Sequence, residues 1–500
     1  MTRVQFVFAP PLNKPKFDEW YEGHVPPLGI LYLASYLKRH IDGLTLRATD
    51  GLLLGKEQTF QEVMAFEPDV LCVSLSTAVA LGGCELINRV RACRPNTLVI
   101  TGGPHATALP EEVLARAAAD VVVLGEGEET LLELMGLYQD HGTLRADDLA
   151  RVRGIAFRLG TKEVARTPPR PYIADLDSIP FPARDLLPMK AYHGYYFHKA
   201  APEWPMAFTR GCPYECIFCA EEVWKLTKPV NVFRCRSPEN VVDEMEELHY
   251  EYGVNEIQDV SDEFNGYPRN SLAICEEKIK RGLDLPWKTL LRAHPLPEYL
   301  VEAMAKSGCW QASIGIETAS QQVNDAVQKN FTIQQLYESL HLLRQYGIKV
   351  QGLFMLFHVW EEEGELRHED VSMSENTIRF ADSLIRAGLL NYTGNFNVAT
   401  PYPGSELFHI ALRHNLIKET LRTNWDAWLV EEPIVMRLPG IPETEQLRLM
   451  RAGSVSMFRC LLREGDLGLG DVAGLMKRAL RVARNELKYR LPVCRRVQGE

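Results

Sequence analysis

The chain has 500 residues, of which 46% are hydrophobic and 24% charged, and its formal net charge is −11. This balance excludes a largely disordered chain, and the acidic charge argues against a protein drawn to nucleic acid or anionic lipid by its overall charge. The length predicts two to four domains with ample core.

No apolar signal segment opens the chain, which begins with Met-Thr-Arg and a strand-like stretch. The longest uncharged run, from Val70 to Cys84, is too short for a membrane-spanning helix. We therefore expect a cytoplasmic protein without membrane partners. The chain has 11 cysteines, a modest number for its length, and we expect them to be free thiols in a reducing compartment.

Over the first 140 residues, short β-branched segments alternate with helical stretches, which predicts a parallel α/β sheet. The expected strands are Val4–Phe8, Leu44–Thr49, Val70–Leu75, Leu98–Thr101 and Val121–Leu124. Five strands with four intervening helices indicate a doubly wound, flavodoxin-like (Rossmann-type) domain. Ligands of such sheets bind at the carboxyl ends of the strands.

Small and polar residues follow three of these strands, and small residues let a ligand approach the backbone. Together with the turn Pro26-Pro27-Leu28-Gly29, these loops resemble those of the cobalamin-binding domain that precedes many radical S-adenosylmethionine (SAM) enzymes. The resemblance implies cobalamin contacts from Ser76, Thr77, Gly102, Gly103, His105, Gly125, Glu126 and Gly127. The alternative is a flavodoxin-like domain that has lost its ligand.

Cobalamin proteins that supply a histidine to the lower face of cobalt use the pattern D-x-H-x-x-G. The stretch from Asp50 to Gly55 matches this frame but carries Leu52 at the histidine position, and it follows the second expected strand rather than the first. We find no such histidine, and similar enzymes of this class lack it. His105 is an alternative contact, although a lone histidine in a loop more often forms a hydrogen bond than binds a metal.

Residues 141–204 have weak periodicity and frequent proline, which predicts a connector packed between two domains. We assign 1–140 to the first domain, 205–408 to the second and 409–500 to a helical C-terminal region.

Three cysteines, Cys212, Cys216 and Cys219, stand at C-x3-C-x2-C spacing after an apolar segment. Three thiolates are one fewer than an ordinary iron–sulfur or zinc site requires. No Cys or His follows at finger-like spacing, which argues against a zinc knuckle. A [4Fe–4S] cluster with three protein ligands keeps one iron open for a substrate or cofactor.

This spacing, with Phe218 before the last cysteine, resembles the cluster motif of the radical SAM enzymes. In that family the open iron chelates SAM, and an electron from the cluster cleaves it to a 5′-deoxyadenosyl radical. The resemblance implies a [4Fe–4S] cluster on the three cysteines, SAM as cosubstrate, and a reductant such as flavodoxin or ferredoxin.

After the cysteines the α/β alternation resumes, with strands expected at Glu256–Val260, Thr289–Arg292, Gln311–Ile316, Val350–Phe357 and Gly394–Ala399. With the strand before Cys212 they make six, the number in a radical SAM partial (β/α)6 TIM barrel. Active sites of barrels lie at the carboxyl ends of their strands.

Polar residues at these ends resemble the family's SAM-contacting stretches. The resemblance implies SAM contacts from Phe218, Asp259, Ser261, Arg292 and Glu317. Arg292 suits a carboxylate because a guanidinium can grip both oxygens. Each of these residues could instead cap a helix or lie on the surface.

The fifth strand departs from the family pattern, because many relatives end it in a Gly-Leu-Pro-Gly turn. Here Phe357-His358-Val359-Trp360 occupies that place, so large side chains stand where the relatives have a flexible glycine-containing turn. This predicts either a specialised pocket or tighter packing.

In the C-terminal region, residues Thr444 to Arg463 and Asp471 to Leu491 are expected to form amphipathic helices. The second is basic, which indicates a solvated face or a surface for an anionic partner. Trp425 and Trp428 either cover the pocket or belong to the core.

Together these resemblances imply a cobalamin-dependent radical SAM methyltransferase acting on an unactivated carbon of a small molecule in biosynthesis. Hydrogen would be abstracted by the 5′-deoxyadenosyl radical, and the methyl group would come from methylcobalamin. Alternatives are a rearrangement or cyclisation without methylation, and a non-catalytic cobalamin or iron–sulfur sensor. The substrate cannot be identified from the sequence.

Overall fold

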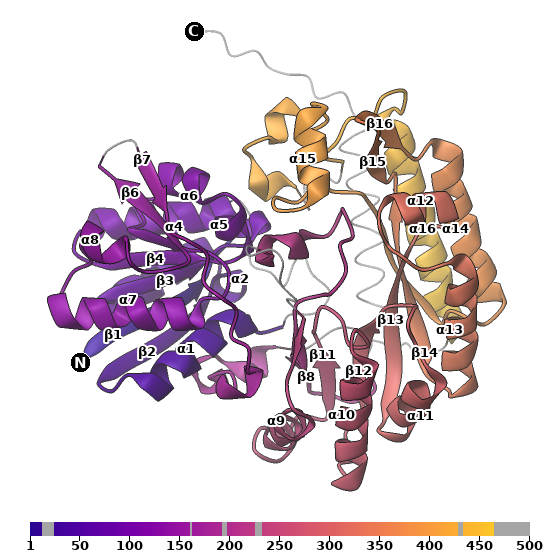
Figure 1. The fold of residues 1–500 in the computed structure, drawn as a ribbon, viewed down its shortest axis with the longest axis horizontal. Coiled ribbons are helices and arrows are strands. Elements are labelled where there is room, and N and C mark those ends of the chain that lie inside the picture. The colour runs from indigo at the N-terminus through magenta and orange to yellow at the C-terminus, as the bar shows by residue number, and fades with distance from the viewer. Residues whose placement is uncertain (13–24, 161–162, 193–197, 226–232, 429–433, 465–500) are drawn as a thin grey trace.

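The computed structural model of the protein describes residues 1–12, 25–160, 163–192, 198–225, 233–428 and 434–464. It contains two large parallel sheets with helices packed on their faces, one from the first third of the chain and one from the middle (Figure 1).

The first sheet contains the five expected parallel strands. They are β1 (Thr2–Phe8), β2 (Leu44–Asp50), β3 (Val70–Ser74), β4 (Leu98–Gly102) and β5 (Val121–Val123). Their order β2-β1-β3-β4-β5 is that of a flavodoxin-like sheet. The expected strands and fold class are confirmed.

The sheet continues beyond the expected boundary at residue 140. Strands β6 (Ile155–Leu159) and β7 (Glu163–Arg166) add to β5 in antiparallel pairing. The first half of the expected connector therefore belongs to the first sheet. These two strands lie at the edge of the sheet, where only the first three residues of β6 are buried and no residue of β7 is. They therefore lack the long apolar segments by which the other strands were predicted.

Alternate side chains of the first sheet enter two separate cores, as the two-residue period of a strand requires. Val70 and Cys72 face the core under α1 (Leu28–His40) and α7 (Glu128–His141). Leu71 and Val73 face the core under α3 (Lys56–Phe66), α4 (Ala80–Cys93) and α6 (Pro110–Arg116). The sheet is thus covered on both faces.

The second sheet has six parallel strands in the order β17-β14-β13-β12-β11-β8. They are β8 (Glu203–Met206), β11 (Glu256–Asp259), β12 (Trp287–Leu291), β13 (Cys309–Glu317), β14 (Lys349–Leu356) and β17 (Tyr392–Val398). The expected partial barrel of six strands is confirmed.

Helices connect the strands of this half-barrel and cover its outer side (Figure 1). They are α9 (Pro238–Tyr250), α10 (Pro268–Lys280), α11 (Glu298–Lys306), α12 (Gln321–Ala326), α13 (Ile333–Gln345) and α14 (Val371–Arg386). A hairpin of β15 (Val359–Glu362) and β16 (Glu365–His368) follows β14. A two-residue strand, β9 (Thr209–Arg210), pairs with β10 (Arg234–Cys235) at the entrance to the cysteine loop.

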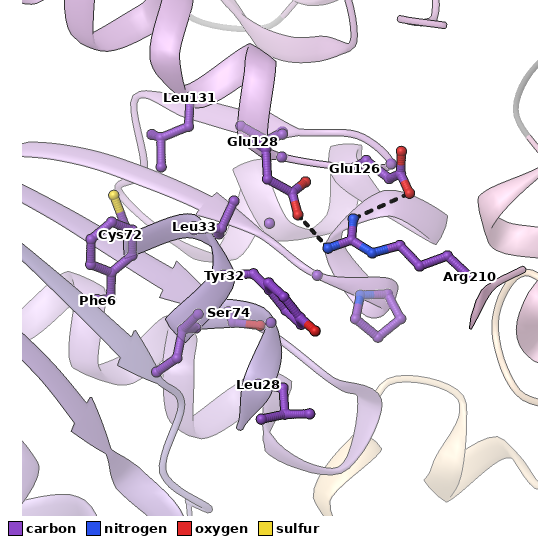
Figure 2. Close-up of a pocket in the computed structure, with 18 of the residues that line it drawn as sticks. Phe6, Leu28, Tyr32, Leu33, Cys72, Ser74, Glu126, Glu128, Leu131 and Arg210 are labelled. Carbon is purple, nitrogen blue, oxygen red and sulfur yellow. Dashed lines mark hydrogen bonds and ion pairs between the residues drawn. The ribbon is translucent and has the colours of Figure 1, made fainter. Parts of the chain in front are cut away.

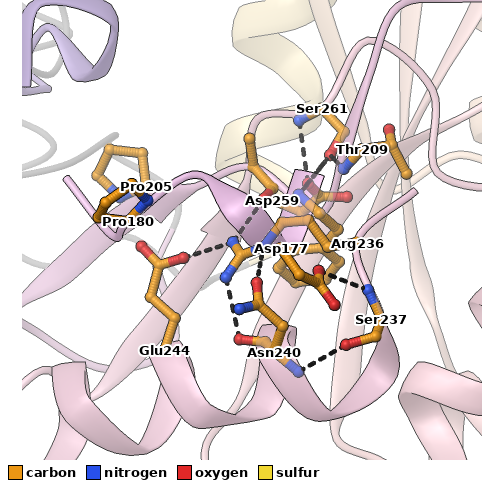
Figure 3. Close-up of polar contacts among 12 residues, drawn as sticks. Asp177, Pro180, Pro205, Thr209, Arg236, Ser237, Asn240, Glu244, Asp259 and Ser261 are labelled. Atoms are coloured by element: carbon orange, nitrogen blue, oxygen red, sulfur yellow. Dashed lines mark hydrogen bonds and ion pairs between the residues drawn. The ribbon is translucent and has the colours of Figure 1, made fainter. Parts of the chain in front are cut away.

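The connector is packed against the half-barrel through buried charges. Arg184 is fully buried and its Nη2 lies 2.7 Å from Glu244 Oε1 of α9, and Arg236 grips the other oxygen of the same carboxylate. Asp177 accepts a hydrogen bond from the backbone N–H of Ser237, the N-cap residue of α9, at 2.9 Å (Figure 3). The second half of the expected connector therefore packs, as predicted.

The C-terminal region begins with α15 (Glu406–Arg413) and the short helix η8 (Trp425–Ala427). The helix α16 (Glu443–Glu464) confirms the expectation for Thr444 to Arg463, whereas Asp471 to Leu491 lies outside the described residues. Over the part of the chain that the structure describes, no helix is long and apolar enough to cross a membrane.

Candidate functional site

A cavity of about 400 Å³ opens at the carboxyl ends of the first sheet and faces the half-barrel (Figure 2). Its apolar wall comes from the sheet and from α1 and α7, including Phe6, Cys72 and Leu131. Its other wall comes from the half-barrel and includes Arg210, Gly211 and Asp262. The cavity therefore lies where the two domains meet.

Five of the residues expected to contact cobalamin line this cavity: Gly102, Gly103, Gly125, Glu126 and Gly127. Gly103 has φ +96°, and a Cβ atom there would lie 2.8 Å from the carbonyl oxygen of Leu75. Only glycine fits this turn, and the missing side chains leave the space open. The shape and apolar lining fit a large planar cofactor held at the strand ends.

The other three expected residues, Ser76, Thr77 and His105, are not among the residues that line the cavity. His105 is buried, its Nδ1 lies 3.3 Å from Thr77 Oγ1, and its ring meets Trp425 edge-on at 5.2 Å between centroids. Burial lowers the pKa of His105 to about 4, so the ring is neutral. His105 thus joins the first domain to the C-terminal region.

Leu52, the residue at the histidine position of the D-x-H-x-x-G frame, also lies away from the cavity lining. The frame follows the edge strand β2, and Asp50 caps the short helix after it through a 2.9 Å hydrogen bond from the N–H of Leu52. Leu52 packs into the core on the other face of the sheet. The stretch from Asp50 to Gly55 therefore matches the motif in sequence but does not lie at the cavity.

Ion pairs join the cavity loop of the first domain to the root of the cysteine loop. Glu126 accepts two hydrogen bonds from Arg234, at 2.8 and 2.9 Å, and Arg210 lies 2.7 Å from Glu128 (Figure 2 shows the Arg210 contacts). Burial alone would raise the pKa of Glu126, but Arg234 and Arg210 lower it below its usual value. Glu126 is therefore a charged link between domains as well as a wall of the cavity.

Asp259 and Ser261 lie under the start of the cysteine loop rather than open to a ligand. Ser261 Oγ accepts hydrogen bonds from the N–H groups of Phe208 and Thr209 at 2.8 and 3.0 Å and donates to Asp259 (Figure 3). Asp259 also accepts from Thr289 Oγ1 at 2.7 Å, and burial raises its pKa. Their contacts with the described residues hold the loop in place.

The three cysteines lie together in the loop after β9. Burial, with a smaller contribution from the neighbouring thiols, raises the pKa of Cys212 and of Cys219 to about 12. Within the described ranges no three His, Cys, Asp or Glu side chains converge as ligands of one ion. A [4Fe–4S] cluster binds each of its cysteine ligands through a different iron, and three thiols on one loop can supply three of those ligands. Iron binding deprotonates its thiols.

Arg292, at the end of β12, lies beside these thiols. Its Nη1 is 3.8 Å from Cys216 Sγ, and its guanidinium lies 3.6 Å from the ring centroid of Tyr214. Nε and Nη2 are buried and have no hydrogen-bond partner among the described residues. Nearby, burial raises the pKa of Glu263 to about 7 against the opposing effect of Arg292. The unpaired donors call for an acceptor such as a carboxylate.

Glu317, at the end of β13, has a positive φ of +65°, a conformation that non-glycine residues adopt rarely. Its Oε1 lies 2.7 Å from Lys329 Nζ in a buried ion pair. A Cβ atom on Gly315 would lie 2.5 Å from the Glu317 carboxylate and 2.7 Å from Lys329 Nζ, so a larger residue there would displace this ion pair. Backbone strain of this kind concentrates at functional sites.

Lys329 is a site residue that the sequence reasoning missed. It lies 5.7 Å from the ring centroid of Phe218, and its neighbours contact the cysteine loop, because Ile217 N–H donates to the carbonyl of Val327 at 3.2 Å. Burial alone would lower the pKa of Lys329, but Glu317 and Cys216 raise it. A lone lysine between two helices gave no signal in the sequence.

A flavodoxin-like domain with a cavity at its strand ends, followed by a six-stranded half-barrel with three cysteines on its first loop, defines a cobalamin-binding radical SAM enzyme. Family models agree: residues 20–135 match the B12 binding domain and residues 206–368 match the Radical SAM superfamily.

An uncharacterized methyltransferase of Pyrococcus horikoshii is 30% identical over 438 residues, which cover 87% of this chain and 88% of that protein. The anaerobic magnesium-protoporphyrin IX monomethyl ester cyclase of Rubrivivax gelatinosus is 30% identical over 77% of this chain and 66% of its own length. The chain belongs to the cobalamin-binding radical SAM family. It is an enzyme whose cofactors are a [4Fe–4S] cluster, SAM and cobalamin.

Among solved structures, the radical SAM methyltransferase TsrM of Kitasatospora setae, with tryptophan and a SAM analogue bound, has a TM-score of 0.65. The match covers 91% of this chain and 89% of TsrM at 15% identity. At this identity the likeness shows the fold.

Proposed function

We propose that this enzyme transfers a methyl group to an unactivated carbon of a small molecule. A methyl cation from SAM cannot be given directly to a carbon without a nucleophilic electron pair, so a second methyl carrier is needed. When bound, the cluster with SAM supplies a hydrogen-abstracting radical and cobalamin supplies the methyl group.

The observation that supports this proposal most is the continuity of the two cofactor sites. Gly211 lines the cavity and immediately precedes Cys212, and its N–H donates to Asp262, another cavity residue, at 2.9 Å. A substrate placed at the domain junction would therefore meet both cofactors.

We assign the cluster to Cys212, Cys216 and Cys219, of which Cys216 is buried and the other two are partly buried, on a loop whose start is anchored by Ser261 and Asp262. We assign Arg292 to the SAM carboxylate, because Nε and Nη2 of its guanidinium lack partners among the described residues. Glu317 would accept from hydroxyl groups of SAM, with Lys329 Nζ, 2.7 Å from Glu317 Oε1, holding the carboxylate in position. The cavity residues Gly102, Gly103, Gly125 and Gly127 would face cobalamin.

A second candidate function is a cyclisation or rearrangement without methyl transfer. A relative named as a cyclase, with 30% identity over 77% of this chain, supports it. The two functions differ in the products formed from SAM: methyl transfer yields S-adenosylhomocysteine as well as 5′-deoxyadenosine, whereas cyclisation yields 5′-deoxyadenosine alone.

The deciding experiment is anaerobic turnover with cobalamin and a chemical or flavodoxin reductant, counting SAM-derived products. The relatives' small-molecule substrate classes serve as the first panel. Methyl transfer predicts S-adenosylhomocysteine and 5′-deoxyadenosine in step with product. Product that forms with 5′-deoxyadenosine but without S-adenosylhomocysteine contradicts the methyltransferase and supports the cyclase.

A further inference from the structure

The first part of the C-terminal region contacts both domains, and the function above gives it no role. It runs from the turn after β17 through α15 to the short helix η8. Figure 1 shows α15, in orange, between the first domain and the hairpin of β15 and β16. None of its residues lines the cavity. We name this segment, residues 404–428, the strap.

One end of the strap is bonded to the cysteine loop. The N–H of Leu407, in the first turn of α15, donates to the carbonyl of Ile217, between the second and third cysteines, at 2.8 Å. Gly404 has φ +95°, and a Cβ atom there would lie 2.9 Å from the Cβ of Val223. Val223 belongs to the short helix η6 (Ala220–Trp224), directly after the third cysteine. This end of the strap is therefore fixed to the loop that carries the cluster ligands.

The other end of the strap is bonded to the first domain. Asp426 Oδ2 accepts a hydrogen bond from the N–H of Leu12, which follows the first strand, at 2.7 Å. Trp425 Nε1 donates to Glu112 Oε1 of α6 at 2.7 Å. Trp425 and Asp426 are 2% and 3% exposed, so both side chains are enclosed where the strap meets the first domain. Each of these hydrogen bonds involves a side chain, so this end can separate without breaking a strand pairing.

The strap meets the first domain directly behind the loops that line the cavity. Its helix η8 contacts η2 (Thr77–Val79), which follows β3, and its Trp425 ring meets His105 in α5 (Pro104–Ala108), which follows β4. The same two connections begin at cavity residues, Ser74 and Gly103. The strap is therefore one continuous link from the cluster loop to the back of the cobalamin loops.

The cavity has one wall from each domain, and two sets of contacts hold these walls together. The first is the group of ion pairs that Arg210 and Arg234 form with Glu126 and Glu128. The second is the strap. A cofactor as large as cobalamin reaches a site between two domains when the domains part, and interfaces of side-chain contacts open by such hinge movements.

We propose that the strap must release from the first domain before cobalamin enters or leaves the cavity. Release breaks the hydrogen bonds of Trp425 and Asp426 but removes no contact with the cofactor, because no strap residue lines the cavity. A weaker strap therefore lowers the barrier to exchange in both directions. The association and dissociation rate constants rise together, and the equilibrium affinity stays the same. The proposal rests on cobalamin binding and holds whether the product is methylated or cyclised.

The test measures cobalamin exchange in the cluster-loaded wild type and in Trp425→Phe, which keeps an aromatic ring against His105 and removes the donor to Glu112. Association is followed under anaerobic conditions by the absorbance of added hydroxocobalamin in stopped flow. Dissociation is followed by chasing bound labelled cobalamin with an unlabelled excess. We expect both rate constants to rise at least about fivefold, because a hydrogen bond to a charged group is lost. The dissociation constant should stay within about twofold of the wild-type value.

Trp428→Phe is the matched control. Trp428 is as buried as Trp425, but its Nε1 donates to the carbonyl of Leu421 at 2.7 Å, within the strap itself. The same chemical change there leaves the bonds to the first domain in place, so both rate constants should equal those of the wild type. Each variant must retain wild-type iron and sulfide content.

Glu112→Ala tests the same hydrogen bond from the first domain, at a partly exposed side chain of α6 where folding is not at risk. It should raise both rate constants as Trp425→Phe does, and it replaces Trp425→Phe if that variant fails to fold. A faster dissociation alone, with weaker equilibrium binding, would show that the strap only supports the cavity wall and would overturn the proposal. Wild-type exchange rates in Glu112→Ala would overturn it as well.

Discussion

The two cofactor sites of this enzyme are built in opposite ways. The cavity of the first domain is made by leaving side chains out, with glycines at four strand-end positions and an apolar wall from the sheet. The cysteine loop is surrounded by buried polar groups, such as Asp259, which bonds to Thr289 of the neighbouring strand β12, and Glu317, which pairs with Lys329 from the connection between α12 and α13. The first site depends on shape, and the second depends on buried polar and charged side chains.

The largest expected effect is the complete loss of one cofactor with the other retained. Cys216→Ala removes one of three ligands, so the [4Fe–4S] cluster should not assemble while the first domain still binds cobalamin. Iron and sulfide analysis, electron paramagnetic resonance and corrin absorbance measure both. Cys93→Ala, at an exposed cysteine of α4, is the control. A full cluster spectrum from Cys216→Ala would contradict the ligand assignment.

The converse change fills the cavity. Gly102 does not require a positive φ, and a Cβ atom there makes only ordinary contacts with Val123 at 3.4 and 3.6 Å, so Gly102→Val should fold. The added methyl groups take cofactor space, and we expect cobalamin affinity to fall at least about 10-fold with iron content unchanged. Titration with cobalamin measures the loss.

Gly136→Val provides the matched control, because Gly136 lies on α7 with open space around its Cβ position. If Gly102→Val binds cobalamin with wild-type affinity, the cavity is not the cofactor site.

The link between the sites is tested through charge. Arg234→Met leaves the partly buried Glu126 with Arg210 and the N–H of Ile173 as partners, and we expect the free energy of unfolding to fall by about 2 kcal/mol. Adding Glu126→Gln should recover part of the loss, because the unpaired carboxylate is then removed. Denaturant unfolding of the single and double variants gives the coupling. Additive effects would show that the pair does not join the domains.

The smallest effect concerns His105 and depends on pH. Its folded pKa of about 4 lies below the ordinary 6.5, so the unfolded chain binds more protons between these values. Stability contributed by the neutral ring is present above pH 6.5 and is lost as pH falls toward 4, about 2 kcal/mol between pH 7 and pH 5. His105→Gln should lose less stability than wild type over that range. Parallel pH profiles would refute the buried neutral ring.

Strand positions of both sheets could be predicted because buried parallel strands are continuous apolar runs, as in Val70–Ser74 and Val121–Val123. The hairpin β6–β7 was missed, since an edge strand such as Glu163–Arg166 carries charged ends. The cysteine motif and the strand-end glycines marked both sites.

Several roles could not be read from the sequence, because residues distant in the chain decide them. Asp259 and Ser261 lie among protein donors that only the fold supplies. Lys329 is held in the site by its ion pair with Glu317, 12 residues earlier in the chain. His105 contacts Trp425 of the C-terminal region. Trp425 and Trp428 are buried and do not line the cavity, so they belong to packing between regions.

The ion pairs of Arg210 have a consequence for chimeric enzymes. Arg210 stands two residues before the first cysteine, yet its partners Glu126 and Glu128 belong to the other domain. Transplanting the first domain from a relative would leave the partly buried guanidinium of Arg210 without these ion pairs unless both acidic residues came with it. Hybrids that combine the first domain of one relative with the half-barrel of another should therefore be active only when Arg210, Glu126 and Glu128 are all present.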